Sequence, residues 1–494
     1  MTLTPALLIV VSLALPLLVL VLIGLFGKLP NLRDGLTLVL SSVLFYVVCC
    51  LADHVFQGGR PELVLGNLLP GFSIGFKVEP LGMVFALVAS GLWIATTVYA
   101  IGYMRSHQEQ HQTRFYACFA VAIFAALAAA FSANLFTLFV AYELMTISTY
   151  PLVTHHGTEK AKLGGRTYLG ILLFTSIAFF MMAIGWTWSV AHTLEFQPGG
   201  ILQESYQTGG IQQWQLMLLL ALFAFGIGKA ALMPFHRWLP AAMVAPTPVS
   251  ALLHAVAVVK VGVFSILKVA IYVFGMDLIR ETSIGEWLAY AAGATILLAS
   301  LVAMTKDNLK ARLAYSTVSQ LAYVTLGAAL ATPASVVGGG MHIVMHAVGK
   351  ITLFFCAGAI YVATQKTDIS DMRGLGRAMP LTMGAFFIAS ISIIGLPPGG
   401  GVWSKWLLAL GTVETHHLFL LAVLMISTLL NIAYLIPIPI RSFMRPVTGD
   451  PPTFKEAPMM CVVPLCCTAV GTIALFFLAN GLYEVLLPIT EVAK

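Results

Sequence analysis

The chain has 494 residues, of which 59% are apolar and only 9% are charged, and its formal net charge is +6. A soluble domain carries roughly a quarter charged residues, so this composition excludes an ordinary soluble protein and predicts an integral membrane protein. The basic residues are scattered through short polar stretches rather than clustered, which argues against a nucleic-acid partner.

Apolar stretches recur along the whole chain, each near the ~20 residues that a helix needs to cross ~30 Å of hydrocarbon. Period-two alternation is absent, so membrane strands are a poor alternative. The first stretch, residues 7–26, has no basic residue before it and no small-residue cleavage site after it, which predicts a retained helix rather than a signal peptide. About fourteen spanning helices are expected, beginning near Leu7, Leu36, Leu81, Phe115, Leu135, Tyr168, Gln215, Val249, Trp287, Arg312, Val336, Leu381, Leu418 and Met460.

The distribution of Lys and Arg predicts the orientation of these helices. With the N-terminus outside, seventeen of the 26 basic residues, Arg445 among them, fall in inner loops. Only Arg60, Lys77, Arg280 and Lys494 fall on the outer side. The positive-inside rule therefore predicts both termini on the periplasmic side of a bacterial cytoplasmic membrane. The remaining five, which lie inside apolar segments where a charge is costly, are Lys229, Lys260, Lys268, Lys350 and Lys405.

Two apolar segments are interrupted. The seventh runs past Lys229 into Pro234 and Pro240, and the twelfth runs into a Gly- and Pro-rich stretch, residues 395–401, just before Lys405. Broken helices at corresponding positions of two halves are typical of inverted repeats with ion sites near mid-membrane. Their offset of five helices predicts two inverted five-helix repeats, residues 115–272 and 287–445, between N-terminal helices (1–114) and a C-terminal helix (458–494).

Glu143 is the only acidic residue well inside a predicted span, about 12 Å from the start of its helix. A carboxylate at this depth is expected to face a polar interior and to pair with a lysine, rather than to reach the membrane surface. Lys229 is the candidate partner, because burial lowers the pKa of a lysine and a nearby carboxylate raises it again. Glu143 and Lys229 would then act as a proton switch, with a static salt bridge as the alternative.

The eighth span contains His254, Lys260 and Lys268. Lys260 lies near its centre and is a candidate relay group, whereas Lys268 lies nearer the outer end, where its ammonium is expected to reach the membrane surface. His254 and Lys260 are six residues apart and so face different sides of the helix, while Lys260 and Lys268 share a face.

In the eleventh span His342, His346 and Lys350 recur every four residues and form one polar stripe. Two histidines at this spacing can bind a metal, but the lysine repels a cation, so we interpret the stripe as a proton path and expect no metal. Ser316, Ser319 and Gln320 in the tenth span are supporting polar groups, which either join helices or hold ordered water.

The sequence contains no motif that is typical of cofactor binding. Its seven cysteines all lie in apolar segments without the paired spacing of zinc or iron–sulfur sites. Nucleotide loops and haem patterns are also absent, so we expect no cofactor and no catalytic residue, and any redox chemistry would reside in partner subunits.

Residues 142–145, 245–254, 310–320, 373–376 and 395–398 resemble segments of one known membrane protein family. This family comprises the proton-conducting subunits of NADH:quinone oxidoreductase (complex I), membrane-bound hydrogenases and multisubunit Mrp-type Na⁺/H⁺ antiporters. The resemblance implies a fourteen-helix fold with two inverted five-helix repeats and broken helices seven and twelve. It assigns Glu143 and Lys229 to the family's carboxylate–lysine pair, His254 and Lys260 to the eighth-helix relay, Lys350 to the connecting lysine and Lys405 to the exit.

The surroundings of Lys260 and Lys405 look most like the D-type subunit of Mrp antiporters, whereas those of His254 look more like complex I subunits. The leading expectation is therefore an H⁺-moving antiporter subunit, with Na⁺ as the counter-ion, among other membrane subunits and lipid. The alternatives are the proton-pumping arm of a redox complex and the membrane subunit of an inorganic-carbon uptake complex. A purely structural subunit is disfavoured by the buried ionisable residues.

Overall fold

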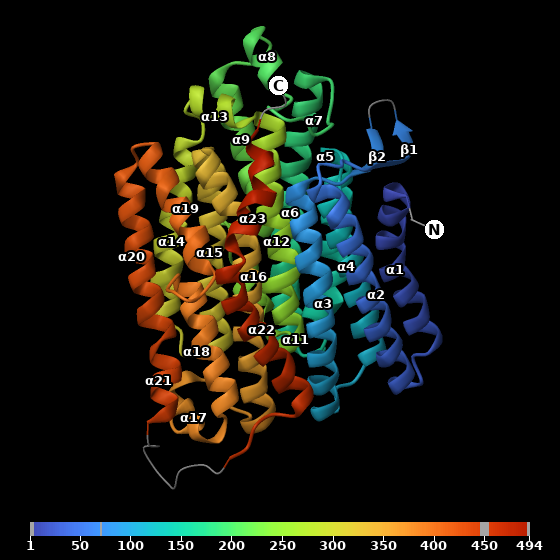
Figure 1. Ribbon diagram of the computed structural model, residues 1–494, viewed down its shortest axis with the longest axis vertical. Coiled ribbons are helices and arrows are strands. Elements are labelled where there is room, and N and C mark those ends of the chain that lie inside the picture. Colours follow the sequence, from blue (N-terminus) through green and yellow to red (C-terminus); the bar gives the residue numbers. More distant parts are fainter. Residues whose placement is uncertain (1–3, 70–71, 445–453, 492–494) are drawn as a thin grey trace.

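The computed structural model describes residues 4–69, 72–444 and 454–491, which form a bundle of helices running side by side (Figure 1). Arg445 and Lys494 of the predicted topology lie outside the described residues, as do both terminal residues. By length and composition, ten of the helices in the described part could cross a membrane. The predicted fold class, a multi-pass helical membrane protein, is confirmed, while the count of fourteen and the inverted repeats stay predictions.

The first part of the chain contains long helices and one antiparallel hairpin. Its elements are α1 (Pro5–Leu25), α2 (Pro30–Phe56), β1 (Glu62–Leu69), β2 (Phe72–Lys77), α3 (Pro80–Ser106), α4 (Gln112–Ala130), α5 (Leu135–Val153), α6 (Glu159–Thr175), the π-turn η1 (Ser176–Phe180) and α7 (Met181–Ala191). The hairpin between α2 and α3 was not expected from the sequence; it lies in the connection of residues 57–79 between two apolar runs.

The middle of the chain is the most irregular part. Its elements are α8 (Gln203–Gln207), α9 (Gln213–Gly226), η2 (Gly228–Ala230), α10 (Trp238–Ala241), η3 (Ala242–Val244), α11 (Thr247–Ala251), η4 (Leu252–Val256), α12 (Val258–Val269), η5 (Ala270–Phe274) and α13 (Met276–Glu281).

The last part returns to long helices. Its elements are α14 (Glu286–Thr305), α15 (Leu309–Leu330), α16 (Pro333–Thr364), η6 (Ile369–Met372), α17 (Leu375–Ala378), α18 (Pro380–Ile394), α19 (Gly401–Glu414), α20 (Leu418–Leu435), α21 (Pro437–Phe443), α22 (Met459–Phe477), α23 (Ala479–Leu486) and η7 (Leu487–Thr490).

Most long helices begin within three residues of the predicted position. The exceptions are α2 and α6, which begin at Pro30 and Glu159 rather than near Leu36 and Tyr168. Their first turns are polar, so hydropathy alone finds only the apolar part that follows. Local signals do mark these starts: proline occupies the first turn of α2, where its missing N–H costs nothing, and the Thr158 hydroxyl accepts a hydrogen bond from the Ala161 N–H at 3.2 Å in α6.

Both predicted interruptions are present. Helix α9 ends at Gly226, and the chain passes Lys229 in the short turn η2 before helix resumes at α10. Helix α18 ends at Ile394, where Gly395 adopts a φ of 89° that favours glycine, and α19 starts six residues later. A third interruption was not predicted: between α11 and α12, the segment that holds Lys260 passes through the π-turn η4 and bends at Ala257.

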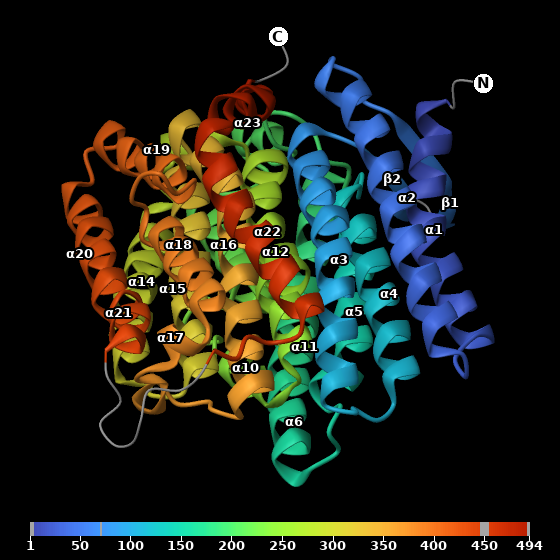
Figure 2. The same ribbon diagram turned by 60° about the horizontal axis from the view of Figure 1, so that its bottom comes forward.

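The 32-residue helix α16 occupies the centre of the bundle, packed against α3, α15, α18, α19 and α22 (Figures 1 and 2). Nearly all of its side chains are buried, including His342, His346 and Lys350. The predicted polar stripe therefore lies inside the protein and not against lipid.

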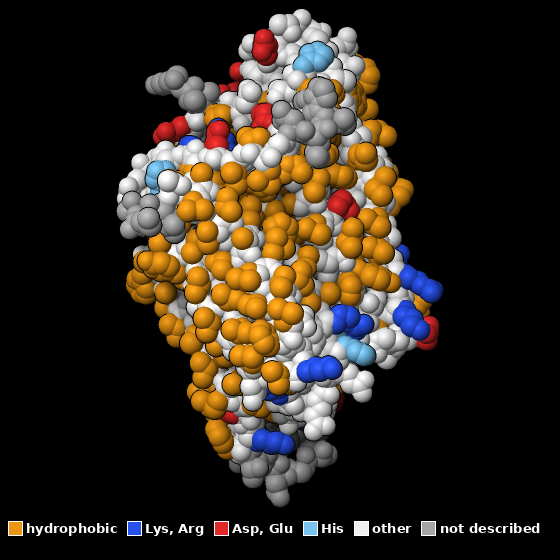
Figure 3. Space-filling view, turned by 90° about the vertical axis from the view of Figure 1, so that its right-hand side faces the viewer, with side chains coloured by type: hydrophobic (Ala, Val, Ile, Leu, Met, Phe, Trp, Pro, Cys, Tyr) orange, Lys and Arg blue, Asp and Glu red, His pale blue; other side chains and the backbone are white. Residues whose placement is uncertain are grey.

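The surface is divided into a central apolar belt and two polar ends. On the face drawn in Figure 3, hydrophobic side chains cover the middle, most Lys and Arg gather in the lower part, and most Asp and Glu lie toward the upper end. Helix α1 starts, and α23 lies, toward that upper end (Figures 1 and 2). This charge asymmetry has the direction that the positive-inside rule requires for outer termini.

The turn at Lys229 is packed directly against α12, because a Cβ atom at Gly262 would overlap the backbone of Lys229 and Ala230. We expect Gly262→Ala to lower the melting temperature of the purified protein in detergent, with a loss of about 1–3 kcal/mol that is typical of overpacking. Gly170→Ala is the matched control, since nothing lies within 4 Å of its Cβ position. Equal melting temperatures for the two variants would contradict this close packing.

Candidate functional site

Lys229 is fully buried, and the hydrogen bonds of its ammonium go to one turn of α5. Its Nζ donates to the carbonyl oxygen of Tyr142 at 2.7 Å and to the hydroxyl of Thr146 at 2.5 Å. The Tyr142 ring lies under the ammonium, 3.1 Å from centroid to Nζ, and its hydroxyl accepts the backbone N–H of Lys229 at 3.0 Å. The break after α9 thus inserts Lys229 against neutral acceptors and an aromatic face.

Glu143 does not form the direct ion pair with Lys229 that the sequence suggested. Among the described residues, the buried Oε1 of Glu143 has no hydrogen-bond partner. The reason is helical geometry: Tyr142 and Thr146 are four residues apart and share the face toward Lys229, whereas position 143 points about 100° away. Glu143 instead borders the outer face of α5, where Val140 and Ile147 are exposed.

Lys260 and His346 are in direct contact through Nζ and Nδ1, and both are buried. His342 stacks on His346 with ring centroids 5.7 Å apart, and its Nδ1 lies 2.9 Å from the Ser404 hydroxyl. The two predicted helices therefore meet at this point. The side chain of His254, the other predicted group of this segment, lies outside the described residues.

Lys350 is bound at the far end of the same stripe on α16. Its Nζ donates to the Ser316 hydroxyl at 2.6 Å and to the carbonyl of Leu313 at 3.3 Å. Ser316 in turn accepts a hydrogen bond from the Tyr434 hydroxyl at 2.9 Å, and Tyr434 also bonds Asn431. A polar chain thus leads from α16 across α15 to α20.

Lys405 is partly buried and is held at the broken end of α18. Its Nζ donates to the carbonyls of Ile393 at 2.9 Å and Ile394 at 3.0 Å, which end a helix and so lack intrahelical partners. The negative end of the helix dipole favours a cation at this position. The Tyr323 ring links Lys405 to His342, lying 4.8 Å from Nζ and stacking on the imidazole at 5.6 Å.

The supporting polar groups of α15 have different surroundings. Ser319 is bonded to the Ile296 carbonyl at 3.1 Å and lies 3.0 Å from the Ser300 hydroxyl, so it joins α15 to α14. Gln320 is fully buried, and neither its Oε1 nor its Nε2 has a hydrogen-bond partner among the described residues. Buried amides are almost always hydrogen-bonded, so ordered water is the expected partner of Gln320.

Lys268 was expected to reach the membrane surface, and this expectation is wrong. Its side chain is 1% exposed, and its Nζ forms an ion pair with Glu79 at 2.8 Å and donates to the Ser132 carbonyl at 2.6 Å. The physical reason is that the chain between β2 and α3 brings a carboxylate to the buried face of α12. This partner is far from Lys268 in sequence and precedes a proline at a helix start, so hydropathy gave no signal for it.

Several other groups of the site were missed, namely Tyr142, Thr146, Ser404, Asn431 and Tyr434. Their one sequence signal is that they are polar or aromatic residues inside an apolar span. This signal is not specific, because most polar and aromatic residues in such spans do not contact a lysine. As for metals, no group of three or more His, Cys, Asp or Glu within the described ranges is placed to hold an ion.

Comparison with known proteins places these features in context. Residues 132–431 match the family model "NADH:quinone oxidoreductase/Mrp antiporter, TM", and residues 70–116 match "NADH-Ubiquinone oxidoreductase (complex I), chain 5 N-terminus". The sequence is 29% identical to the N subunit of the NADH-quinone oxidoreductase of Desulforudis audaxviator over 91% of each chain. It is 27% identical to the D-type subunit of the Na(+)/H(+) antiporter of Alkalihalophilus pseudofirmus, over 97% of this chain and 96% of that one.

Among solved structures, a chain of the Mrp complex from Dietzia sp. DQ12-45-1b superposes with a TM-score of 0.83. The sequence identity is 20%, and the match covers 97% of each chain. The two chains therefore share a fold over nearly their whole length.

The contact between Thr146 and Lys229 can be tested by stability alone. Thr146→Val removes an acceptor from a buried ammonium, so we expect it to cost about 1.5–3 kcal/mol, the range for hydrogen bonds to charged groups. Lys229→Met removes the ammonium and should not lower the melting temperature, because the cost of burying the charge disappears with it. The measurement is thermal unfolding of the purified complex in detergent.

The double variant supplies the control. With Lys229→Met in place, Thr146→Val should cost far less than it does alone, since the hydroxyl no longer faces a charge. An equal cost in both backgrounds would mean that Thr146 does not stabilise the ammonium.

Proposed function

The chain belongs to the family of NADH:quinone oxidoreductase and Mrp antiporter transmembrane subunits, and we propose that it translocates protons as one subunit of a multisubunit membrane complex. The proposed complex is a cation/H⁺ antiporter of Mrp type, in which this chain is the equivalent of the D-type subunit. Similarity over nearly the full length of the D-type subunit of an Na(+)/H(+) antiporter supports this assignment and makes Na⁺ the proposed counter-ion.

One observation carries the proposal. Lys229, Lys260 and Lys350 are buried, yet none of them forms an ion pair within the described part of the chain. Their ammonium groups meet carbonyls, hydroxyls and an imidazole instead. Burial without a carboxylate brings the charged and neutral forms of a lysine close in free energy, which is what a proton relay needs.

The proposed path uses each group in turn. Glu143 acts on Lys229 as a switch that favours the protonated form when the carboxylate approaches. Protons then pass between Lys260 and His346 to Lys350 and Lys405, and His254 is proposed as a further relay group of the same segment. The supporting polar groups and the ordered water they hold would bridge the gaps; they are His342, Ser316, Ser319 and Gln320.

The proposed setting is a bacterial cytoplasmic membrane with both termini on the periplasmic side. Residues 115–272 and 287–445 are proposed as the two inverted repeats, flanked by residues 1–114 and 458–494. Neighbouring membrane subunits are the proposed partners on the outer face of α5, because a carboxylate beside exposed Val140 and Ile147 is costly against lipid. Lipid would cover the rest of the apolar belt.

A second candidate is the proton-pumping arm of a redox complex, which the similarity to the N subunit of an NADH-quinone oxidoreductase favours. The relay residues would have the same roles, and electron transfer in other subunits would drive them. The subunits that co-purify with this chain separate the two candidates: small membrane subunits indicate an antiporter, and quinone- or cluster-binding subunits indicate a redox pump.

We expect Glu143→Gln and Lys229→Ala each to reduce proton translocation by the assembled complex at least tenfold. A charge at the centre of a span costs about 2.5–3.5 kcal/mol on insertion scales, so removing one should leave expression and assembly intact. A neutral amide at position 143 no longer attracts a proton to Lys229, and alanine at 229 has no proton to pass. The measurement is proton uptake into inverted membrane vesicles.

Glu159→Gln and Lys162→Ala are the matched controls, because these residues form an exposed ion pair at the start of α6 and should transport normally. The double variant at 143 and 229 should be no worse than either single one, since residues acting as one switch are not additive. Near-normal transport by either single variant in an intact complex would leave the pair with a structural role only.

The orientation is tested by cysteine substitution at Lys160, Lys306 and Lys366. All three should be inaccessible to a membrane-impermeant thiol reagent in intact cells and labelled in inverted vesicles, because the positive-inside rule places them in the cytoplasm. Wild-type protein, with its seven native cysteines, sets the background. Labelling of any of the three from outside would reject the predicted topology.

A further inference from the structure

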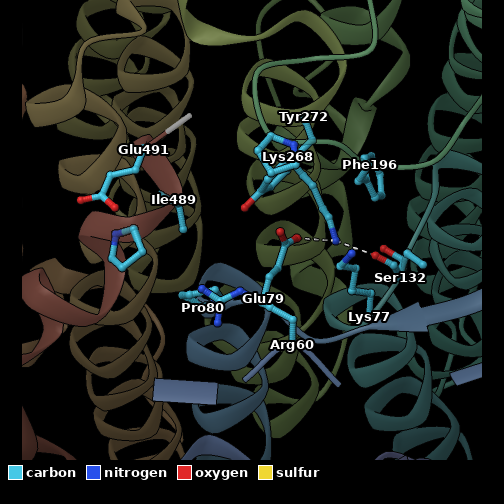
Figure 4. Close-up of a pocket in the computed structure, with 13 residues that line it drawn as sticks. Arg60, Lys77, Glu79, Pro80, Ser132, Phe196, Lys268, Tyr272, Ile489 and Glu491 are labelled. Atoms are coloured by element: carbon cyan, nitrogen blue, oxygen red, sulfur yellow. Dashed lines mark hydrogen bonds and ion pairs between the residues drawn. The ribbon is translucent and has the colours of Figure 1, made fainter. Parts of the chain in front are cut away.

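A large pocket lies at the upper end of the bundle, the end toward which α1 starts. Its volume is about 890 Å³, and its wall includes the end of β2, the start of α3, the top of α12 and the C-terminal turn η7 (Figure 4). Charged side chains of both signs face it: Arg60, Lys77, Glu79, Lys268 and Glu491. A pocket of this size and polarity holds many water molecules.

The buried ion pair of Glu79 and Lys268 forms part of the pocket wall. Figure 4 shows Lys268 reaching between Glu79 and the carbonyl of Ser132. The Lys268 side chain is 1% exposed and that of Glu79 is 12% exposed, so the carboxylate is the member nearer to water. Within the pocket wall, Lys268 is therefore the more deeply buried member of the pair.

Lys268 is also connected to the proposed relay by the helix that carries it. Lys260 lies eight residues earlier on α12, about 12 Å along the axis and about 80° around it. Lys260, Lys268 and Glu79 thus lie in this spatial order between the centre of the protein and the pocket at its upper end.

We propose that this pocket is the outer aqueous mouth of the proton path and that Glu79 and Lys268 exchange protons between it and the interior. This inference rests on the proposed function and extends it to a site outside the central row of lysines. The Lys268 ammonium gives a proton to the Glu79 carboxylate, breaking an N–H bond and forming an O–H bond. Glu79 then releases this proton to a pocket water as hydronium, and the neutral Lys268 amine takes the next proton from the interior.

The charges around the pocket favour proton exchange over storage of a metal cation. Arg60 and Lys77 face the same space and repel a cation, although Lys77 is partly neutralised by Glu62 at 2.5 Å on the adjacent strand. A hydronium formed at Glu79 is repelled by the same groups and leaves toward bulk water. The exposed Glu159–Lys162 pair at the start of α6 does not line the pocket and serves as the control for the buried pair.

The alternative is a simple structural tie between α3 and α12. The double variant Glu79→Gln/Lys268→Met separates the two, because it removes both charges and leaves no unpaired buried ion. We expect this variant to assemble normally and to translocate protons at least tenfold more slowly in vesicles. Glu159→Gln/Lys162→Met, which changes an exposed pair outside the pocket, should stay within about twofold of wild type. Transport by the Glu79→Gln/Lys268→Met variant within twofold of wild type would overturn the proposal.

Measuring Glu143→Gln in the same vesicles distinguishes a failure of the pocket role from a failure of the proposed function. If Glu143→Gln loses transport while the Glu79→Gln/Lys268→Met variant keeps it, the pocket role is rejected and the proposed function stands. If both keep transport, the proposed function itself is rejected.

Water access is tested without transport. Ala133 lines the pocket, and Ala133→Cys should react with a membrane-impermeant thiol reagent in intact cells. Lys160→Cys, at the opposite end, should react only in inverted vesicles. Ala133→Cys that reacts from the inner side, or from neither side, would overturn the assignment of the pocket as an outer mouth.

Discussion

The cost of placing an ammonium group inside a membrane protein is the constraint on which this structure depends. Each buried lysine must find acceptors where water is scarce, and the fold supplies them in different ways. Lys229 is met by one turn of an intact helix and an aromatic face, and Lys350 by a hydroxyl and a carbonyl. Because these acceptors are neutral, they solvate the ammonium groups without pairing them with a carboxylate.

Interrupted helices are the second means of supplying acceptors. An unbroken span uses its carbonyls internally, so it has few to offer a neighbouring cation. Ending α18 at Ile394 frees the carbonyls that bind Lys405, and the turn after α9 lets Lys229 enter the space beside α5. The close approach of Gly262 to this turn then fixes its position against α12. Interrupted helices and buried lysines therefore occur together, because the interruptions supply the free carbonyls and the space that an ammonium group needs.

How far the sequence predicts this structure depends on the range of each interaction. Helix positions, the breaks near Lys229 and Lys405 and the stripe on α16 follow from local hydropathy, proline and glycine content and periodicity. Partners across the bundle do not: Glu143 was matched to Lys229 by chemistry, yet side-chain direction on α5 gives the direct contacts to Tyr142 and Thr146. Glu79 was missed as the partner of Lys268 for the same reason. Short polar turns also hid the true starts of α2 and α6, as hydropathy averages over a whole span.

The contact between Lys260 and His346 limits how many charges this stretch can hold. Two nitrogen bases in direct contact can share one proton, since the protonated member donates to the lone pair of the other. A second proton would place two positive charges side by side in a medium of low dielectric constant, where their repulsion is strong. On the proposed proton path, this position would hold one proton at a time, and the next proton would enter only after the first had left.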